Sequence, residues 1–145
     1  MLDDIIKGVS MQLRASFGEG YEIYQNDVQQ GLTEPCFFVA VLQPEVAPLR
    51  GGRFMQSNPL DVHYFPAEQG DNGALFSMAE RLWEALEIIT LPDGDRLSGT
   101  GMRFEAVDGV LHFFVSYDTI LTRPAQDIYM ENLRQQIGTT ERSEP

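Results

Sequence analysis

Cysteine and long apolar runs are scarce in this 145-residue chain, and each scarcity excludes a class of protein. Cys36 is the only cysteine, so no disulfide can form within the chain, and zinc sites built from paired cysteines are excluded. A reducing, cytosolic place of synthesis suits such a chain. No stretch approaches the roughly 18 apolar residues of a membrane helix. The first residues also lack a basic segment followed by an apolar run, so we expect neither a membrane span nor a secretion signal.

Positive charge is also in short supply. The net charge is −12, from 22 acidic and 10 basic side chains. Such a balance repels phosphate backbones and disfavours direct nucleic-acid binding as the main task. Solubility alone is the competing explanation of the acidity. Apolar residues, in contrast, make up 43% of the chain, enough for the core of one domain. We place that single domain at residues 1–138 and a mobile polar tail at residues 139–145.

Two helices are predicted from apolar residues at three- and four-residue spacing. The first covers residues 2–17, and the second covers residues 71–86 with Asp71 or Asn72 as its N-cap. A short third helix is expected within residues 126–137. The apolar stripe of the first helix is Leu2, Ile5, Ile6, Val9, Leu13 and Phe17, and that of the second is Leu75, Met78, Ala79, Leu82, Trp83 and Leu86.

Strand patterns fill most of the remaining chain. Residues 36–42 form a continuous apolar run, which is typical of a central strand covered on both faces. Pro44 and Pro48 limit the extended segment that follows to a sheet edge. The chain then turns and returns, so we predict a long hairpin over residues 36–65 whose tip projects beyond the sheet. Shorter strands are expected at residues 21–25 and 87–91.

The clearest turn is Asp108-Gly109, which supplies the two positive-φ positions of a type I′ hairpin turn. Two alternating strands flank this turn over residues 101–122. Counting outward from the turn predicts a buried sheet face made of the pairs Met102–Val115, Phe104–Phe113 and Ala106–Leu111. Arg103, Glu105, His112 and Phe114 fall on the other face. The order of helices and strands predicts an α+β fold, a mostly antiparallel sheet with the two main helices packed on one face.

Candidate catalytic groups are few. Asp61 and His63 share a strand face and could orient a general base, but a partly exposed structural pair is the simpler interpretation. His112 lies opposite Glu105 in the predicted hairpin, and a cross-strand charge pair explains it without a function. Cys36 begins an apolar run and has no neighbouring base, so we interpret it as a buried small residue and not as a nucleophile.

Motifs for phosphate binding, metal binding or nucleophilic catalysis are missing from the sequence. Gly99-Thr100-Gly101 is followed by a strand, where a dinucleotide-binding motif requires a helix. Asp93 and Asp95 flank a turn and are too few for a calcium site. We therefore expect no catalytic residue, no metal site and no cofactor, and we expect that the protein is not an enzyme.

Contact with another protein is the function that the residues themselves favour. Arg50 and Arg53 flank Gly51-Gly52 at the predicted hairpin tip, and Phe54 and Met55 follow. On an acidic protein, a basic and apolar tip can dock onto an acidic patch of an identical neighbour. A solvated hairpin end is the alternative. We predict a subunit interface at Arg50, Arg53, Phe54 and Met55.

Taken together, these patterns resemble the tail terminator, or tail completion, proteins of tailed phages, prophages and phage-tail-like bacteriocins. The resemblance covers roughly residues 1–125. It is carried by patterns that shape a fold and not by catalytic signatures. These patterns are the opening helix from Leu2, the strand Tyr21 to Tyr24, the segments Glu34 to Val39 and Arg53 to Pro66, the helix Leu75 to Leu86, and Met102 to Tyr117 around Asp108-Gly109.

This resemblance implies a mixed α/β subunit that assembles into a hexameric ring. Such a ring caps the last layer of the tail tube, ends tube elongation and offers the surface that joins the head; in a contractile tail it also meets the end of the sheath. The family has no enzymatic activity and no cofactor. An acidic lumen would let DNA pass through without sticking, which gives the net charge a use. The protein would belong to a virion or phage-tail-like particle assembled in the bacterial host cytoplasm.

Two other classes of protein stay open at this point. A small acidic α+β protein can be an inhibitor or immunity protein that mimics nucleic acid and blocks a nuclease. That role requires acidic groups clustered on one face, whereas here they are spread along the chain. A small hydrolase or isomerase is disfavoured because no His, Cys and Ser residues converge in the sequence.

Overall fold

The computed structural model describes residues 2–25, 32–68, 70 and 72–123. Asp71 as a helix N-cap, the predicted helix within residues 126–137 and the predicted tail at residues 139–145 lie outside these residues. Neither helix of the described part is long and apolar enough to cross a membrane.

The chain divides into two compact units. The first unit comprises residues 1–44 and 57–118, and the second comprises residues 45–56 and 119–145. A single domain over residues 1–138 stays a prediction.

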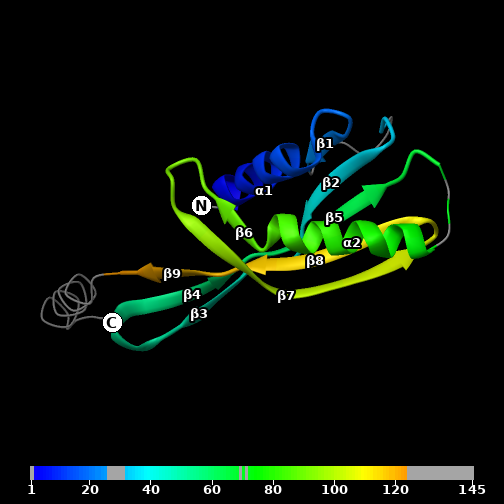
Figure 1. The fold of residues 1–145 in the computed structure, drawn as a ribbon. Helices are drawn as coiled ribbons and strands as arrows, with labels where there is room; N and C mark the ends of the chain where they lie inside the picture. Colours follow the sequence, from blue (N-terminus) through cyan, green and yellow to red (C-terminus); the bar gives the residue numbers. More distant parts are fainter. Residues whose placement is uncertain (1, 26–31, 69, 71, 124–145) are drawn as a thin grey trace, which may run out of the picture. The chain divides into compact units, whose positions relative to one another are not determined.

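The first unit is a six-stranded sheet with two helices on one face (Figure 1). The strand order is β1-β2-β5-β8-β7-β6, in which β1 runs parallel to β2 and every other neighbouring pair is antiparallel. The predicted α+β class, with a mostly antiparallel sheet and both helices on one face, is confirmed. The elements are α1 (Leu2–Phe17), β1 (Glu22–Gln25), β2 (Cys36–Val41), β5 (Pro59–Phe65), α2 (Asn72–Leu86), β6 (Ile88–Thr90), β7 (Arg96–Val107) and β8 (Val110–Tyr117).

Both helices bury their apolar stripes in one core with the sheet, with one exception. Trp83 was predicted on the buried face of α2, but 57% of its surface is exposed. Successive residues of a helix are turned by about 100°, so a helix that buries Leu82 directs Trp83 sideways and out of the core. The buried residues of α1 are Ile5, Ile6, Gly8, Val9 and Leu13, and those of α2 are Leu75, Met78, Ala79, Leu82, Ala85 and Leu86.

Tyr117 joins the end of β8 to the end of α2. Its side chain is fully buried, and its hydroxyl donates a 2.6 Å hydrogen bond to the carbonyl of Leu86. Burial raises the pKa of this hydroxyl far above its ordinary value, so it stays a donor. The buried Asn58 lies on the other side of the Tyr117 backbone, where its Nδ2 donates to the Tyr117 carbonyl at 3.0 Å. The two contacts satisfy polar groups that are otherwise costly to bury.

The Asp108-Gly109 turn has the predicted form, because the two residues adopt φ values of 52° and 77°. Phe104 lies opposite Phe113 and Ala106 opposite Leu111, as predicted. Farther from the turn, the predicted residue pairing is wrong. An irregularity between Thr100 and Arg103 interrupts the register, and the predicted Met102–Val115 pair is not formed. Phe104 was predicted in the core but is 46% exposed.

The second unit contains a three-stranded sheet of order β3-β4-β9 (Figure 1). Its strands are β3 (Glu45–Pro48), β4 (Arg53–Ser57) and β9 (Thr119–Thr122). The strand predicted to run on to residue 122 ends at Tyr117, and β9 pairs instead with β4. The predicted hairpin over residues 36–65 is thus built in two parts, β2 with β5 in the large sheet and β3 with β4 in the small one. The proline-containing segment lies at a sheet edge, as predicted.

Candidate assembly surfaces

The tip between β3 and β4 is a single turn of 3₁₀ helix, Arg50–Gly52. Gly51 and Gly52 adopt φ values of 72° and 74°, a backbone conformation that favours glycine. The Leu49 N–H donates to the carbonyl of Arg53 at 2.7 Å, and Arg53 Nε donates to the carbonyl of Arg50 at 3.2 Å. The predicted turn is confirmed, and it leaves both arginines exposed.

The four residues predicted as a subunit interface lie on two faces of the small sheet. Phe54 lies opposite Leu121, and Met55 lies opposite Ile120. Side chains alternate along a strand, so Phe54 points to one face while Arg53 and Met55 point to the other. A partner that contacts all four residues must therefore wrap around this sheet.

The Phe54 face of the small sheet has a shallow hollow of about 350 Å³. The guanidinium of Arg123 lies over the Phe54 ring, 5.1 Å from its centroid. The Arg123 backbone N–H donates to the carbonyl of Gly52 at 2.8 Å, which holds this third arginine beside the tip. The hollow is lined by Val46, Phe54, Leu121, Thr122 and Arg123.

The described residues of the second unit are basic, although the chain as a whole is acidic. They contain Arg50, Arg53 and Arg123 against a single carboxylate, Glu45. Several large apolar side chains are also exposed there, among them Val46 and Ile120. Sequence reasoning missed Arg123, because it assigned residues 119–122 to the Asp108-Gly109 hairpin and not to a strand beside β4.

The exposed face of α2 has the opposite character. Glu80 and Glu84 are exposed on this helix, and Glu87 follows its last residue. Trp83 and Phe76 lie on the same side, since residues 76, 80, 83 and 84 fall within about a third of a helical turn. A hollow of about 310 Å³ runs beside them, lined by Ala79, Glu80, Trp83, Met102, Phe104 and Phe113. We call Phe76, Glu80, Trp83, Glu84 and Glu87 the α2 face. The sequence prediction overlooked it because Trp83 was assigned to the core.

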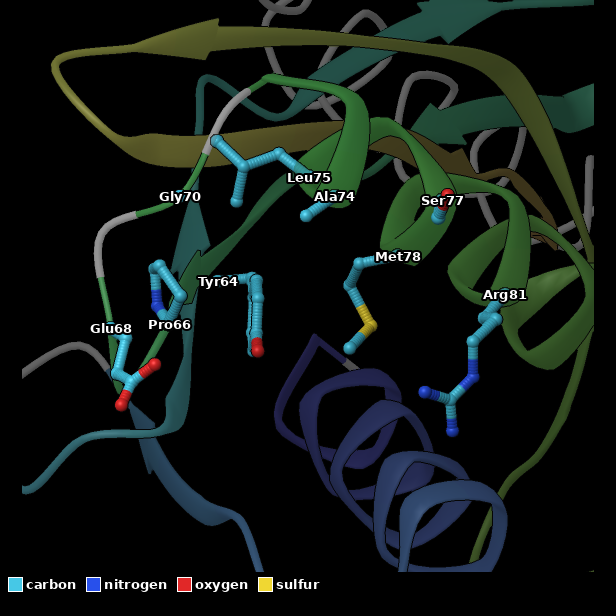
Figure 2. Close-up of a pocket in the computed structure, with 9 residues that line it drawn as sticks. All are labelled: Tyr64, Pro66, Glu68, Gly70, Ala74, Leu75, Ser77, Met78 and Arg81. Carbon is cyan, nitrogen blue, oxygen red and sulfur yellow. The ribbon is translucent and has the colours of Figure 1, made fainter.

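A smaller hollow of about 160 Å³ opens where β5 ends and α2 begins (Figure 2). Tyr64, Met78 and Arg81 line it, and the Arg81 guanidinium lies 4.6 Å from the centre of the Phe17 ring. Burial raises the pKa of the Tyr64 hydroxyl, and the nearby Arg81 charge opposes that shift. Binding pockets for small molecules are usually about 300–1,000 Å³, so this hollow suits a few waters or one side chain of a partner.

The sheet face opposite the helices carries both histidines of the chain. His112 lies opposite Glu105, as predicted. The carboxylate that it contacts is that of Asp61, whose Oδ2 lies 3.0 Å from His112 Nδ1. His63 Nε2 lies 2.8 Å from the same oxygen, so the predicted pair of Asp61 and His63 is confirmed as a contact. The missed neighbour, His112, comes from β8, which the sequence did not place beside β5.

In the comparison with protein families, residues 4–129 match the phage tail terminator proteins. The chain belongs to the phage tail terminator family. It accordingly has a structural role in a phage tail. The resemblance read from the sequence over roughly residues 1–125 is therefore confirmed.

Solved structures and curated sequences add little to the family match. A chain from the virion of a native gene transfer agent particle is similar to this family member with 15% identity and a TM-score of 0.42, over 83% of this chain and 96% of that chain. Comparison with curated protein sequences returned no match.

Proposed function

We propose that this tail terminator family member forms a hexameric ring that caps the tail tube and ends its elongation. The free side of the ring would offer the surface that joins the head, or that meets the sheath in a contractile tail. The family match over residues 4–129 carries this proposal. The protein then acts by shape and contact, not as an enzyme, in a particle assembled in the cytoplasm of a bacterial host.

A ring requires each subunit to present two different, complementary surfaces. A head-to-tail contact of this kind closes into a ring when its rotation divides a full turn, and a sixfold ring matches a sixfold tube. We assign one surface to the basic tip, which consists of Arg50, Arg53, Phe54 and Met55 as predicted, together with Arg123. We assign the other to the α2 face of the next subunit.

Charge and apolar character support this pairing. The tip offers guanidinium groups beside exposed apolar side chains. The α2 face offers the carboxylates of Glu80, Glu84 and Glu87 beside Trp83, which is 57% exposed. Arg favours contacts with both carboxylates and aromatic faces, and aromatic residues and Arg are enriched at protein interfaces. This pairing uses only a few of the acidic side chains of each subunit. Some of the others would line a lumen through which DNA passes without binding.

Charge reversal tests the assignment. We expect Arg50→Glu with Arg53→Glu to leave a folded monomer that no longer forms rings, because two attractive contacts per interface become repulsive. The measurement is particle mass by light scattering, alone and after mixing with tail-tube protein, with folding checked by circular dichroism. The matched control is Arg14→Glu with Arg96→Glu, which changes the charge equally at exposed arginines of the first unit. It should keep wild-type assembly.

The partner surface can be tested by restoring the charge pair. Adding Glu80→Arg and Glu84→Arg to the double reversal should recover rings, because each contact then pairs opposite charges again. Rings that form in the Arg50→Glu, Arg53→Glu variant would exclude the tip as the interface. A wild-type protein that stays monomeric even with its tube would overturn the ring proposal itself, and it would favour the inhibitor class.

A further inference from the structure

The face of the large sheet opposite the two helices brings three metal-ligating side chains to one point. His63 on β5 lies directly opposite His112 on β8 in the antiparallel register. Asp61 lies two residues before His63 on the same strand face. These two histidines are the only ones in the chain, and both belong to this cluster. Strand pairing therefore brings His112 to Asp61 and His63, although His112 lies 51 residues from Asp61 in the sequence.

The geometry of the cluster is already close to that of a ligand set. Asp61 Oδ2 lies 2.8 Å from His63 Nε2 and 3.0 Å from His112 Nδ1. The three ligand atoms all lie within 4.8 Å of one another, and the two imidazole centroids are 4.5 Å apart. Ligands bound tetrahedrally at about 2.0–2.1 Å from an ion stand roughly 3.3 Å from each other. Small side-chain shifts would bring all three atoms to such an ion.

The other carboxylate oxygen of Asp61, Oδ1, is independent evidence for a ligand at this site. Asp61 is only 7% exposed, and its Oδ1 is buried with no hydrogen-bond partner. Buried polar atoms are nearly always satisfied by protein, water or an ion. A cation beside the carboxylate would satisfy this oxygen, whereas the two imidazole contacts both use Oδ2.

The surroundings favour a partly shielded site. The Phe38 ring lies 5.7 Å from the His63 ring, and the Phe114 ring lies 6.3 Å from the His112 ring. Arg103 is held over Phe114 at 4.1 Å from the ring centre, and the exposed Glu105 lies opposite His112 in the register. Apolar walls beside the ligands limit water access, and the Glu105 carboxylate lowers the cost of a nearby cation.

We propose that Asp61, His63 and His112 bind a divalent transition-metal ion, zinc in the first instance, that links β5 to β8. Two imidazoles and one carboxylate suit zinc, with the fourth position left to water, and they do not suit magnesium, which prefers oxygen ligands and retained waters. The sequence analysis predicted no metal site because it did not place β8, and with it His112, beside β5. The ion ties two neighbouring strands of the sheet together, so its role is structural and independent of ring formation.

Metal titration of the full-length chain, made without a polyhistidine tag and stripped with a chelator, tests this site. We expect zinc chloride to bind one ion per chain in calorimetry and to raise the melting temperature, while magnesium chloride does neither. Asp61→Asn and His63→Ala should each weaken zinc binding by at least roughly tenfold. The matched control is Asp118→Asn, which removes a carboxylate on the same sheet face beyond the end of β8 and should bind zinc as the wild type does.

A measurement on the wild type guards against variants that fail to fold. The two histidines give the only imidazole signals in a proton NMR spectrum, and nickel should shift or broaden both together. The proposed site would be wrong if folded wild-type protein bound no zinc, or if nickel left the histidine signals unchanged. Asp61→Asn and His63→Ala variants that bind zinc as tightly as the wild type would overturn the ligand assignment and with it the proposal.

Discussion

At the scale of single residues, Cys36 shows how position decides reactivity. The thiol is fully buried at the start of β2. Burial, aided by the nearby carboxylates of Glu34 and Glu22, raises its pKa from 9.0 to about 11. The thiolate is the reactive form, so the sequence interpretation of a buried, unreactive cysteine agrees with this environment.

We expect native Cys36 to resist alkylation by iodoacetamide at pH 8, because a two-unit rise in pKa leaves roughly a hundredfold less thiolate. Unfolding in denaturant should restore rapid reaction, which mass spectrometry detects as a single added group. The folded state holds the proton more tightly than the unfolded state. The contribution of this group to stability is therefore complete below pH 9 and is lost as the pH rises toward 11. Rapid, complete labelling of the folded chain would contradict this account.

At the scale of elements, two glycines let the helices approach the sheet. A Cβ added to Gly8 of α1 would lie 3.0 Å from the carbonyl oxygen of Thr90 on β6. A Cβ added to Gly99 of β7 would lie 2.7 Å from Val115 Cγ2 and 3.1 Å from the Leu86 carbonyl at the end of α2. Close packing between elements here depends on the absence of a side chain.

We predict that Gly99→Ala lowers the free energy of unfolding by about 1–3 kcal/mol, the usual cost of overpacking a filled core. The matched control is Gly20→Ala, because a Cβ there meets nothing within 4 Å and the backbone φ is not positive. That change should alter stability by less than about 0.5 kcal/mol. Denaturant unfolding of both variants measures the difference in the free energy of unfolding. Equal unfolding midpoints would show that β7 and β8 move apart to accommodate the added methyl group at little cost.

At the scale of the whole molecule, two electrostatic effects oppose each other. Every subunit carries a net charge of −12, so copies repel one another over a distance set by the salt concentration. The basic tip and the α2 face attract at short range if the proposed contact is correct. Added salt weakens both effects, and the direction of the net response tells which one dominates the interface.

We expect rising sodium chloride to reduce the ring fraction of the wild type, because local attraction holds the subunits in contact. The Arg50→Glu, Arg53→Glu variant should respond in the opposite direction and regain some association, since salt screens the repulsion that the two glutamates add. Size-exclusion chromatography with light scattering across a salt series measures both. Stronger wild-type association at high salt would mean that apolar contacts, and not the arginines, hold the ring.

Most of the local structure could be predicted from the sequence. Apolar periodicity predicted α1 and the length of α2, and the chemistry of Asp108-Gly109 predicted the β7–β8 turn and the register next to it. These features depend on neighbours in the chain, so a reader of the sequence can find them. The family resemblance came from the same patterns.

Patterns of neighbouring residues were enough to predict the α+β class, the hairpin turn and the family. Which surfaces and side chains meet became known only from the folded chain. Exposure of Trp83, pairing of β9 with β4, and the meeting of His112 with Asp61 all depend on contacts between distant segments. Spacing along a chain specifies which side a residue faces on its own element. It does not specify which other element lies there, because that choice minimises the free energy of the whole core at once.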